Sequence, residues 1–290
     1  MNSIHSGAIA AIIFCAAALA AAGQDRSENL FYIINYTISH CNAEVNLNGV
    51  PITKTHKDTA YTASGTADIG RWLVPGDNVI TVVLLPPEGT IDPDDRQSIE
   101  ITVSTALRGQ MSDEGTKIAG LRIPVKEGDA SLASIRQLKK KELRFKPARV
   151  PPSDLWEKAK PEKLDDAARA EILRLVRDYH AAYVKKNREK LNDMLMFATL
   201  DAARNRYVSA DEAREMLAKG LKEMLADRSF VMEPLRADLI VLKPVAGGRV
   251  IWVTDSKDEA PVRTKRMKDG GYIEFPVYVS RIDGKWVIVR

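Results

Sequence analysis

The sequence predicts a two-domain protein, an all-β sandwich followed by an α+β domain, and three observations predict it. The chain has 290 residues, which is enough for about two domains. Residues 30–125 contain short runs of β-branched and aromatic residues, with turn sequences about every ten residues. Residues 165–290 instead begin with helical periodicity and end in several strands, which is the element order of an α+β domain.

The first domain, expected over residues 29–125, is predicted from its strands and turns. Asn48-Gly49 lies between apolar residues, which is the strongest short signal for a β-hairpin. Pro75-Gly76-Asp77-Asn78 is a turn sequence that leads into an apolar run. The strands are expected at residues 30–39, 43–47, 66–73, 79–85, 98–107 and 117–125.

Residues 126–164 are predicted to be a basic, proline-containing linker. Pro147, Pro151, Pro152 and Pro161 interrupt a stretch rich in Lys and Arg, and prolines break regular structure. Within it, a short helix or strand that docks on a domain through Leu143, Phe145 or Trp156 is the alternative to a wholly solvated connection. Charge runs of this kind are typical of solvated segments.

The second domain, expected over residues 165–290, opens with three helical patterns. Asp165 is a candidate N-cap, and the apolar residues behind it recur at helical spacing. Arg188–Met196 is a second, short helix. Ser209 and Glu212 form a capping-box pattern before the third helix. The strands are expected at residues 235–245, 249–255, 261–268, 272–281 and 285–290.

Composition restricts the classes of function. Hydrophobic residues make up 45% of the chain and charged residues 28%. This composition is typical of a folded protein with hydrophobic cores and not of a disordered chain. The formal net charge of +4, from 43 basic and 39 acidic residues, is too small to indicate a nucleic-acid partner. We therefore expect no binding to nucleic acid.

Residues 1–22 have the features of a signal peptide. Residues 8–22 are continuously apolar and end in small residues, as signal-peptidase substrates do, and the run is short for a membrane span. No Lys or Arg precedes it, which departs from the usual pattern. The segment predicts an exported protein, periplasmic or extracellular; the alternative is a retained membrane anchor formed by residues 8–22.

Cleavage of this segment removes Cys15 and leaves Cys41 as the one remaining cysteine, so no internal disulfide is expected. His40 precedes it, but consecutive side chains in a strand point to opposite faces. A Cys–His dyad is therefore excluded there, and a buried, unreactive thiol is predicted.

Two resemblances to known families add to this reading. Residues 47–84 contain Asn48-Gly49, Asp68-Ile69, Leu73 and the pattern Gly76, Asn78, Ile80, Val82. In this order the motifs resemble the galactose-binding-like jelly-roll modules appended to many secreted glycoside hydrolases. The resemblance implies a sandwich fold, and members either bind sugars or brace a neighbouring domain. Because the matching residues serve turns and core, they indicate a fold and not a site.

The last 125 or so residues resemble the NTF2-like superfamily in their element order and in the ending "VSRIDGKWVIVR", Val279–Arg290. The resemblance implies a cone of helices against a curved sheet. Enzymes of the ketosteroid-isomerase type in this superfamily use a carboxylate base and a tyrosine in that cone. The corresponding catalytic candidates are Asp238, His180 and Tyr183, and the pocket candidates are Tyr179, His180, Tyr183, Trp252 and Tyr278. The alternative is that these tyrosines are core residues and that Asp238 faces solvent.

Other catalytic signatures are missing from the sequence. His40, His56 and His180 have no metal-ligand spacing, and nucleophile-elbow, P-loop and dinucleotide motifs do not occur. Asp92, Asp94 and Asp95 favour a turn, with calcium binding as the alternative. We predict no cofactor and no metal, and an exported, non-catalytic two-domain protein that binds a glycan or envelope polymer, a small apolar ligand or a protein partner. The alternatives are an NTF2-like lyase or isomerase and a scaffold that dimerises through the C-terminal sheet.

Overall fold

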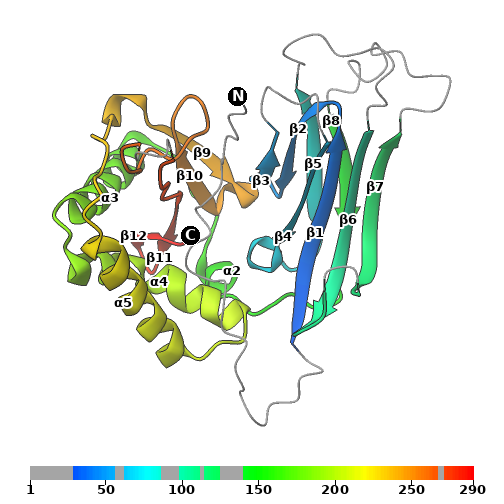
Figure 1. Ribbon diagram of the computed structural model, residues 1–290, viewed down its shortest axis with the longest axis horizontal. Helices are drawn as coiled ribbons and strands as arrows, with labels where there is room; N and C mark the ends of the chain where they lie inside the picture. The colour runs from blue at the N-terminus through cyan, green and yellow to red at the C-terminus, as the bar shows by residue number, and fades with distance from the viewer. Residues whose placement is uncertain (1–28, 56–61, 86–97, 112–113, 125–139, 267–270) are drawn as a thin grey trace. The chain divides into compact units, whose positions relative to one another are not determined.

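The computed structural model describes residues 29–55, 62–85, 98–111, 114–124, 140–266 and 271–290 (Figure 1). The chain divides into two compact units, which are described separately below: the N-terminal unit, residues 23–152, and the C-terminal unit, which contains residues 153–290. The predicted signal peptide and the aspartates of residues 92–95 lie outside the described residues. No helix among the described residues is long and apolar enough to cross a membrane.

The N-terminal unit is all-β and contains two four-stranded antiparallel sheets, as a sandwich requires (Figure 1). The first sheet has the order β4-β1-β6-β7 and the second the order β3-β2-β5-β8. The strands of the first are β1 (Leu30–Ser39), β4 (Thr62–Asp68), β6 (Ser98–Leu107) and β7 (Thr116–Pro124). Those of the second are β2 (Asn42–Leu47), β3 (Val50–Lys54), β5 (Asn78–Leu85) and β8 (Lys140–Phe145).

Alternation along each strand places apolar side chains on one face of each sheet. In β1, Ile34 and Ile38 are fully buried, while Asn35 and Thr37 between them lie on the opposite face. The buried apolar residues of this unit, besides Cys41, are Tyr32, Ile34, Ile38, Ala43, Val45, Leu47, Val50, Ile69, Trp72, Leu73, Ile80, Val82, Ile99, Ile101, Val103, Ala106, Ile123 and Phe145. Cys41 is buried as well, in agreement with its expected role as a small apolar residue.

The two predicted turns form as expected and are joined by asparagine side chains. Asn48 and Gly49 both have positive φ, 54° and 81°, as a type I′ hairpin turn requires. Gly76 has a φ of 93°, which disfavours any residue with a Cβ. The Asn48 Nδ2 donates to the Asn78 Oδ1 over 2.9 Å. This hydrogen bond links the hairpin turn at Asn48 to the turn that ends at Asn78.

The range predicted as a linker contains two regular elements. Strand β8 pairs antiparallel with β5 and buries Phe145 at its end, so it completes the second sheet. Helix α2 (Asp154–Lys158) buries Leu155 and Trp156 and belongs to the C-terminal unit. The boundary between the two units therefore lies at residues 152 and 153, and the docked strand and helix considered as an alternative are both present.

The C-terminal unit packs helices on one antiparallel sheet, an α+β layout. Its helices are α2, α3 (Asp166–Val184), α4 (Arg188–Asn205) and α5 (Ala210–Ala226), and its sheet has the order β12-β11-β10-β9. The strands are β9 (Val241–Val245), β10 (Val250–Thr254), β11 (Val277–Ile282) and β12 (Lys285–Ile288). Asp165 and Ser209 cap α3 and α5 by accepting from backbone N–H groups, as predicted.

Three predicted elements of this unit differ from the structure. Helix α4 continues to Asn205, well past Met196. The strand expected at residues 235–245 begins only at Val241, and it is preceded by the short 3-10 helix η3 (Ala237–Leu239). In the described part of the second hairpin, residues 261–266 and 271–281, the structure has one named strand, β11, and two isolated bridges, Met232–Thr264 and Arg263–Glu274. A further 3-10 turn of this unit is η4 (Ala246–Gly248), and the N-terminal unit contains η2 (Gly70–Trp72) after β4.

The core of the C-terminal unit lies between the helices and one face of the sheet. Helix α3 contributes Ile172, Val176, Tyr179 and Tyr183, which recur every three or four residues along one face. The sheet contributes Ile251, Val253, Val277, Val279 and Ile288. Burying such a set removes a large apolar area from water, which is the main force holding the unit together.

Candidate functional site

The tyrosines predicted to line a pocket form part of the packed core instead. Tyr179 and Tyr183 are 3% and 2% exposed, and their hydroxyl oxygens lie 3.0 Å apart. The Tyr183 ring stacks on Phe275 with 4.2 Å between centroids and lies 6.0 Å from Phe230. Burial raises the pKa of both tyrosines above the ordinary value. The two hydroxyls share one hydrogen bond within the core, in which one donates and the other accepts.

The acid and base candidates, Asp238 and His180, do not form a site with these tyrosines. Asp238 lies in η3 and is exposed, not in a strand facing the core, and both its carboxylate oxygens accept hydrogen bonds from Arg236. This guanidinium lowers the pKa of the Asp238 carboxyl, so the group is a poor general base. The His180 Nε2 lies 2.7 Å from the backbone oxygen of Glu233. Asp238, His180 and the tyrosines therefore make no shared catalytic set.

Trp252 and Tyr278 lie side by side on the sheet face opposite the core. Their rings are stacked with 6.2 Å between centroids and 15° between planes. The Lys243 ammonium lies 5.2 Å from the Trp252 ring and also pairs with Asp258. Trp252 is half-buried and Tyr278 is buried, so neither presents an open ring face on which a ligand can stack.

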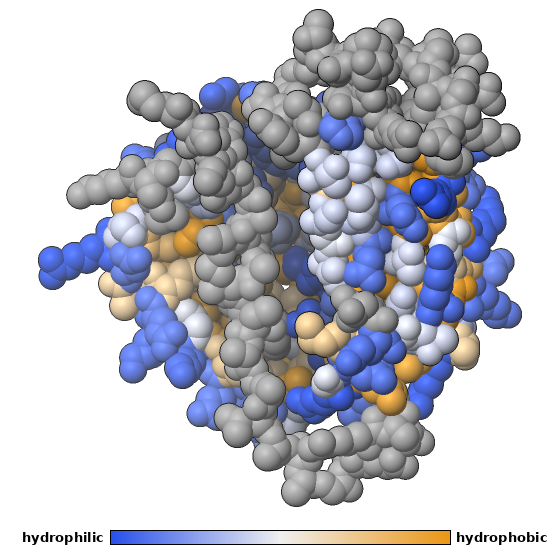
Figure 2. Space-filling model, turned by 45° about the vertical axis from the view of Figure 1, so that its right-hand side comes forward, coloured by the Kyte–Doolittle hydropathy of each residue, from blue (hydrophilic) through white to orange (hydrophobic). Residues whose placement is uncertain are grey.

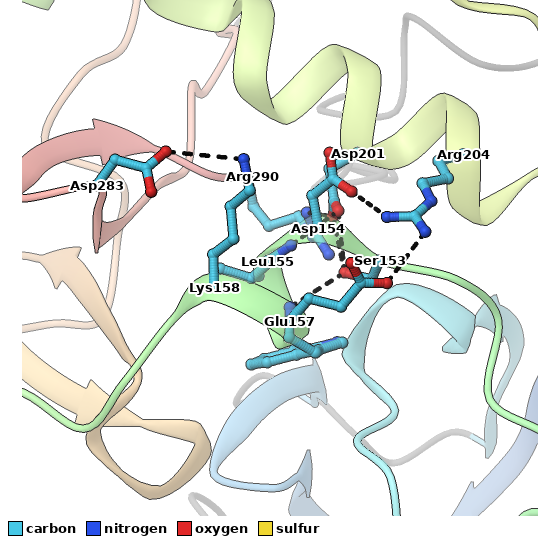
Figure 3. A network of polar contacts seen from close by, with 10 residues as sticks. Ser153, Asp154, Leu155, Glu157, Lys158, Asp201, Arg204, Asp283 and Arg290 are labelled. Atoms are coloured by element: carbon cyan, nitrogen blue, oxygen red, sulfur yellow. Dashed lines mark hydrogen bonds and ion pairs between the residues drawn. The ribbon is translucent and has the colours of Figure 1, made fainter.

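A buried polar network that sequence reasoning missed connects α2 with α4 (Figure 3). Asp201, on α4, is fully buried, and its Oδ1 accepts hydrogen bonds from the Ser153 hydroxyl and the Leu155 backbone N–H, both over 3.0 Å. Its Oδ2 accepts from the Arg290 guanidinium over 2.6 Å. The Arg290 side chain is only 3% exposed, so the ion pair is removed from water.

The bonds to Asp201 identify this network as an anchor. Both carboxylate oxygens already accept hydrogen bonds from groups of the protein, and the bond from Arg290 is charge-assisted. Burial lowers the pKa of Arg290, and the Asp201 charge opposes that shift. Outside this pair, Arg204 binds Asp154 and Glu157, and Lys158 binds Asp283 (Figure 3). The network fixes α2 on α4.

The N-terminal unit presents a surface of a different kind, which we call the hydroxyl face: the side of the β4-β1-β6-β7 sheet that points away from its buried side chains. The register places the following side chains on it: Asn35, Thr37 and Ser39 of β1, Thr62, Ser64 and Thr66 of β4, and Ser98, Glu100 and Thr102 of β6. Arg122 of β7 lies opposite Glu100. Pale colouring over this unit in Figure 2 marks side chains of weak hydropathy, such as threonine and serine.

The side chains of the hydroxyl face are aligned by hydrogen bonds between strands. The Thr62 hydroxyl donates to Ser39 over 3.1 Å, the Ser64 hydroxyl to Thr37 over 3.2 Å and the Thr66 hydroxyl to Asn35 over 2.7 Å. Each hydroxyl has one proton and two acceptor positions, so acceptor capacity remains after these bonds. The result is a regular, almost uncharged array of oxygen atoms on a rigid sheet.

Cys41 and the surface hollow on the C-terminal unit do not form a functional site. Burial raises the pKa of the Cys41 thiol to about 11, which keeps it protonated and unreactive at neutral pH. A surface hollow of about 330 Å³ is lined by Arg188, Glu189, Asn192 and Ala218, and none of the predicted pocket residues lines it. In the part of the chain that the structure describes, no three His, Cys, Asp or Glu side chains gather as a metal site.

Comparison with known proteins adds no relative to this picture. A scan against models of protein families gives no match, and a search of curated proteins gives none at a significant level.

Proposed function

We propose that this chain is an exported, non-catalytic binding protein whose N-terminal unit binds a neutral polysaccharide through the hydroxyl face. In this proposal the N-terminal unit is a galactose-binding-like sandwich and the C-terminal unit an NTF2-like domain with a filled cone. The observation that carries the proposal is the hydroxyl face, an aligned array of Asn, Thr and Ser side chains over three neighbouring strands.

The chemistry of this face suits a sugar polymer. A polysaccharide presents many neutral hydroxyls at regular intervals, and such groups are recognised by neutral donors and acceptors held in fixed positions. Waters that bridge two hydroxyls contribute nearly as much as direct bonds. Strands separated by about 4.8 Å give the array a regular repeat in one direction. Glu100 and Arg122 oppose one another across β6 and β7, so the face carries little net charge.

The arrangement of the C-terminal unit supports a non-catalytic role. A pocket enzyme requires an acid, a base and an oxyanion donor around one cavity. Here Tyr179 and Tyr183 bond one another in the core, while Asp238 is held by Arg236 at the surface. Binding is therefore the role that the described residues support best.

The proposal is tested by co-sedimentation of the chain with insoluble glycans, namely peptidoglycan sacculi, cellulose and chitin. We expect saturable binding to at least one of them. The triple variant Thr37→Val, Thr66→Val, Thr102→Val removes three hydroxyls from the face without changing side-chain volume, charge or strand preference. We expect it to reduce binding by about tenfold or more, because each lost bond contributes about 1 kcal/mol.

The matched control is Thr81→Val, which removes a hydroxyl from β5, in the other sheet. It should leave binding unchanged, and thermal melts should show all variants folded. Equal loss of binding in the control and the triple variant would contradict the proposal, as would the absence of binding to every glycan. A turnover assay whose activity disappears in Asp238→Asn or His180→Gln would overturn the non-catalytic assignment.

A further inference from the structure

The four edge strands of the N-terminal unit are not protected equally. An exposed edge offers unpaired N–H and C=O groups to other chains, and proteins usually block it with charges, proline or a bulge. Strand β8 carries four charged residues in six. Strand β3 contains Pro51 and Lys54, and its pairing with β2 contains a bulge. Strand β7 contains Lys117, Arg122 and Pro124, and its pairing with β6 is also irregular.

Apart from Asp68 at its end, strand β4 has none of these devices. Its sequence, Thr62–Asp68, is TASGTAD, so six of its seven residues are small, uncharged and not proline. Its pairing with β1 is regular from end to end. Among the residues that the structure describes, no strand pairs with its outer edge. The contrast with the other three edges indicates that the β4 edge is an interaction surface.

The backbone groups available at this edge can be assigned. The Ile69 N–H donates to the Tyr32 oxygen over 2.9 Å, so this residue directs its backbone polar groups toward β1. Because residues of an antiparallel strand alternate in direction, those of Ala63, Gly65 and Ala67 also point to β1. Those of Ser64 and Thr66 then point outward, and both side chains are exposed.

We infer that the β4 edge pairs antiparallel with the β4 edge of a second copy of this chain. The pairing is centred on Gly65, the midpoint of the strand, and places Ser64 opposite Thr66 of the second copy. In this register the outward-pointing residues of both copies meet, and the two Ser64–Thr66 pairs exchange about four N–H···O bonds. Thr62 faces Asp68 of the second copy, so no two like charges are opposed.

The side chains on both faces of β4 permit this approach. On the inner face, Ala63 lies opposite Ala67 of the second copy, and Gly65 lies opposite Gly65. An added Cβ at Gly65 would come within 2.3 Å of the Tyr36 hydroxyl, so the Tyr36 ring already covers this part of the edge strand. A two-fold axis perpendicular to the sheet brings the hydroxyl faces of both copies to the same side, which makes one continuous eight-stranded sheet.

The inference concerns assembly, and it stands whether or not the hydroxyl face binds a glycan. It is tested by sedimentation velocity of the full chain over a range of concentrations. We expect a reversible monomer–dimer equilibrium of modest affinity, because a single strand edge buries less area than a stable interface does. Thr66→Lys adds a charge at the edge, and Thr66→Pro removes an N–H that points away from β1. We expect each to weaken dimerisation by roughly tenfold or more.

The matched control is Thr116→Lys, which adds the same charge to the exposed edge strand β7 and should leave the equilibrium unchanged. Circular dichroism melts confirm that each variant is folded. A wild-type chain that stays monomeric at its highest soluble concentration would overturn the inference. A dimer that Trp252→Ala dissociates and Thr66→Lys does not would overturn it in favour of pairing through the C-terminal sheet. Glycan co-sedimentation is scored separately, so failure of either proposal is recognised independently.

Discussion

Replacing Asp201 by alanine is expected to destabilise the C-terminal unit by about 3–5 kcal/mol, because it leaves a buried charge without its partner. The Arg290 guanidinium is 3% exposed and loses its ion pair, and the Ser153 hydroxyl and Leu155 N–H lose their acceptor. Urea unfolding followed by tryptophan fluorescence measures this, because Trp156, Trp252 and Trp286 all lie in this unit.

Asp154→Ala is the control for the Asp201 prediction. Asp154 also pairs with an arginine, Arg204, but the two side chains are 38% and 42% exposed, so the effect should stay below about 1 kcal/mol. A double variant, Asp201→Leu with Arg290→Met, removes both charges and should be more stable than Asp201→Ala alone. If Asp201→Ala and Asp154→Ala are equally mild, the network is not the anchor described above.

Replacing Asn78 by alanine is expected to destabilise the N-terminal unit by about 3 kcal/mol or more. Asn78 is fully buried, and its Nδ2 donates to the backbone oxygens of Val74 and Gly76, while its Oδ1 accepts from the Val74 N–H. The Oδ1 also accepts from Asn48. Each buried group that loses its partner costs about 1 kcal/mol or more.

Hydrogen exchange followed by mass spectrometry resolves this effect, because peptides from β2, β3 and β5 report the N-terminal unit alone. We expect faster exchange there in Asn78→Ala and unchanged exchange in α3–α5. Asp77→Ala is the control, since Asp77 is exposed in the same turn and should have little effect. Unchanged protection of β5 in Asn78→Ala would contradict the role assigned to this side chain.

Sequence reasoning predicted the elements whose signals are local. Asn48-Gly49 and Ser209 determine a turn and a helix start through their own backbone and side-chain chemistry, and both form as predicted. The sequence favours a linker over the residues of strand β8, because four of its six residues are charged and only Leu143 and Phe145 are apolar. Its pairing with β5 depends on a distant part of the chain, which local pattern cannot show.

The surroundings of the polar residues in the C-terminal unit were less predictable, because they depend on which polar groups tertiary packing buries. The apolar residues around Asp238 predict a strand, but in the structure Asp238 lies in the 3-10 helix η3. Asp201 was missed because helix α4 was expected to end at Met196. A signal existed: Leu191, Met194, Ala198, Asp201 and Asn205 recur every three or four residues. A carboxylate on such an apolar stripe indicates a buried partner.

Tyr179 and Tyr183 lie in the packed core of the C-terminal unit and do not line an open pocket, and the non-catalytic proposal depends most on this placement. Spectrophotometric titration of tyrosine ionisation tests it most directly. Burial raises the pKa of Tyr179 and Tyr183, so both stay neutral in the folded chain through the range near pH 10 where exposed tyrosines ionise. Because their pKa values are lower in the unfolded chain, rising pH favours unfolding, and the two should ionise only with that transition.

The decisive comparison is between wild type and Tyr183→Phe, each measured folded and in guanidinium chloride. In denaturant the variant should lose the amplitude of one tyrosine among the eight in the chain. In the folded state, the step near pH 10 should have the same amplitude in both proteins, because Tyr183 does not contribute to it. A folded-state step that loses one tyrosine's amplitude in Tyr183→Phe would show a solvent-accessible hydroxyl in an open cavity, and would contradict the account.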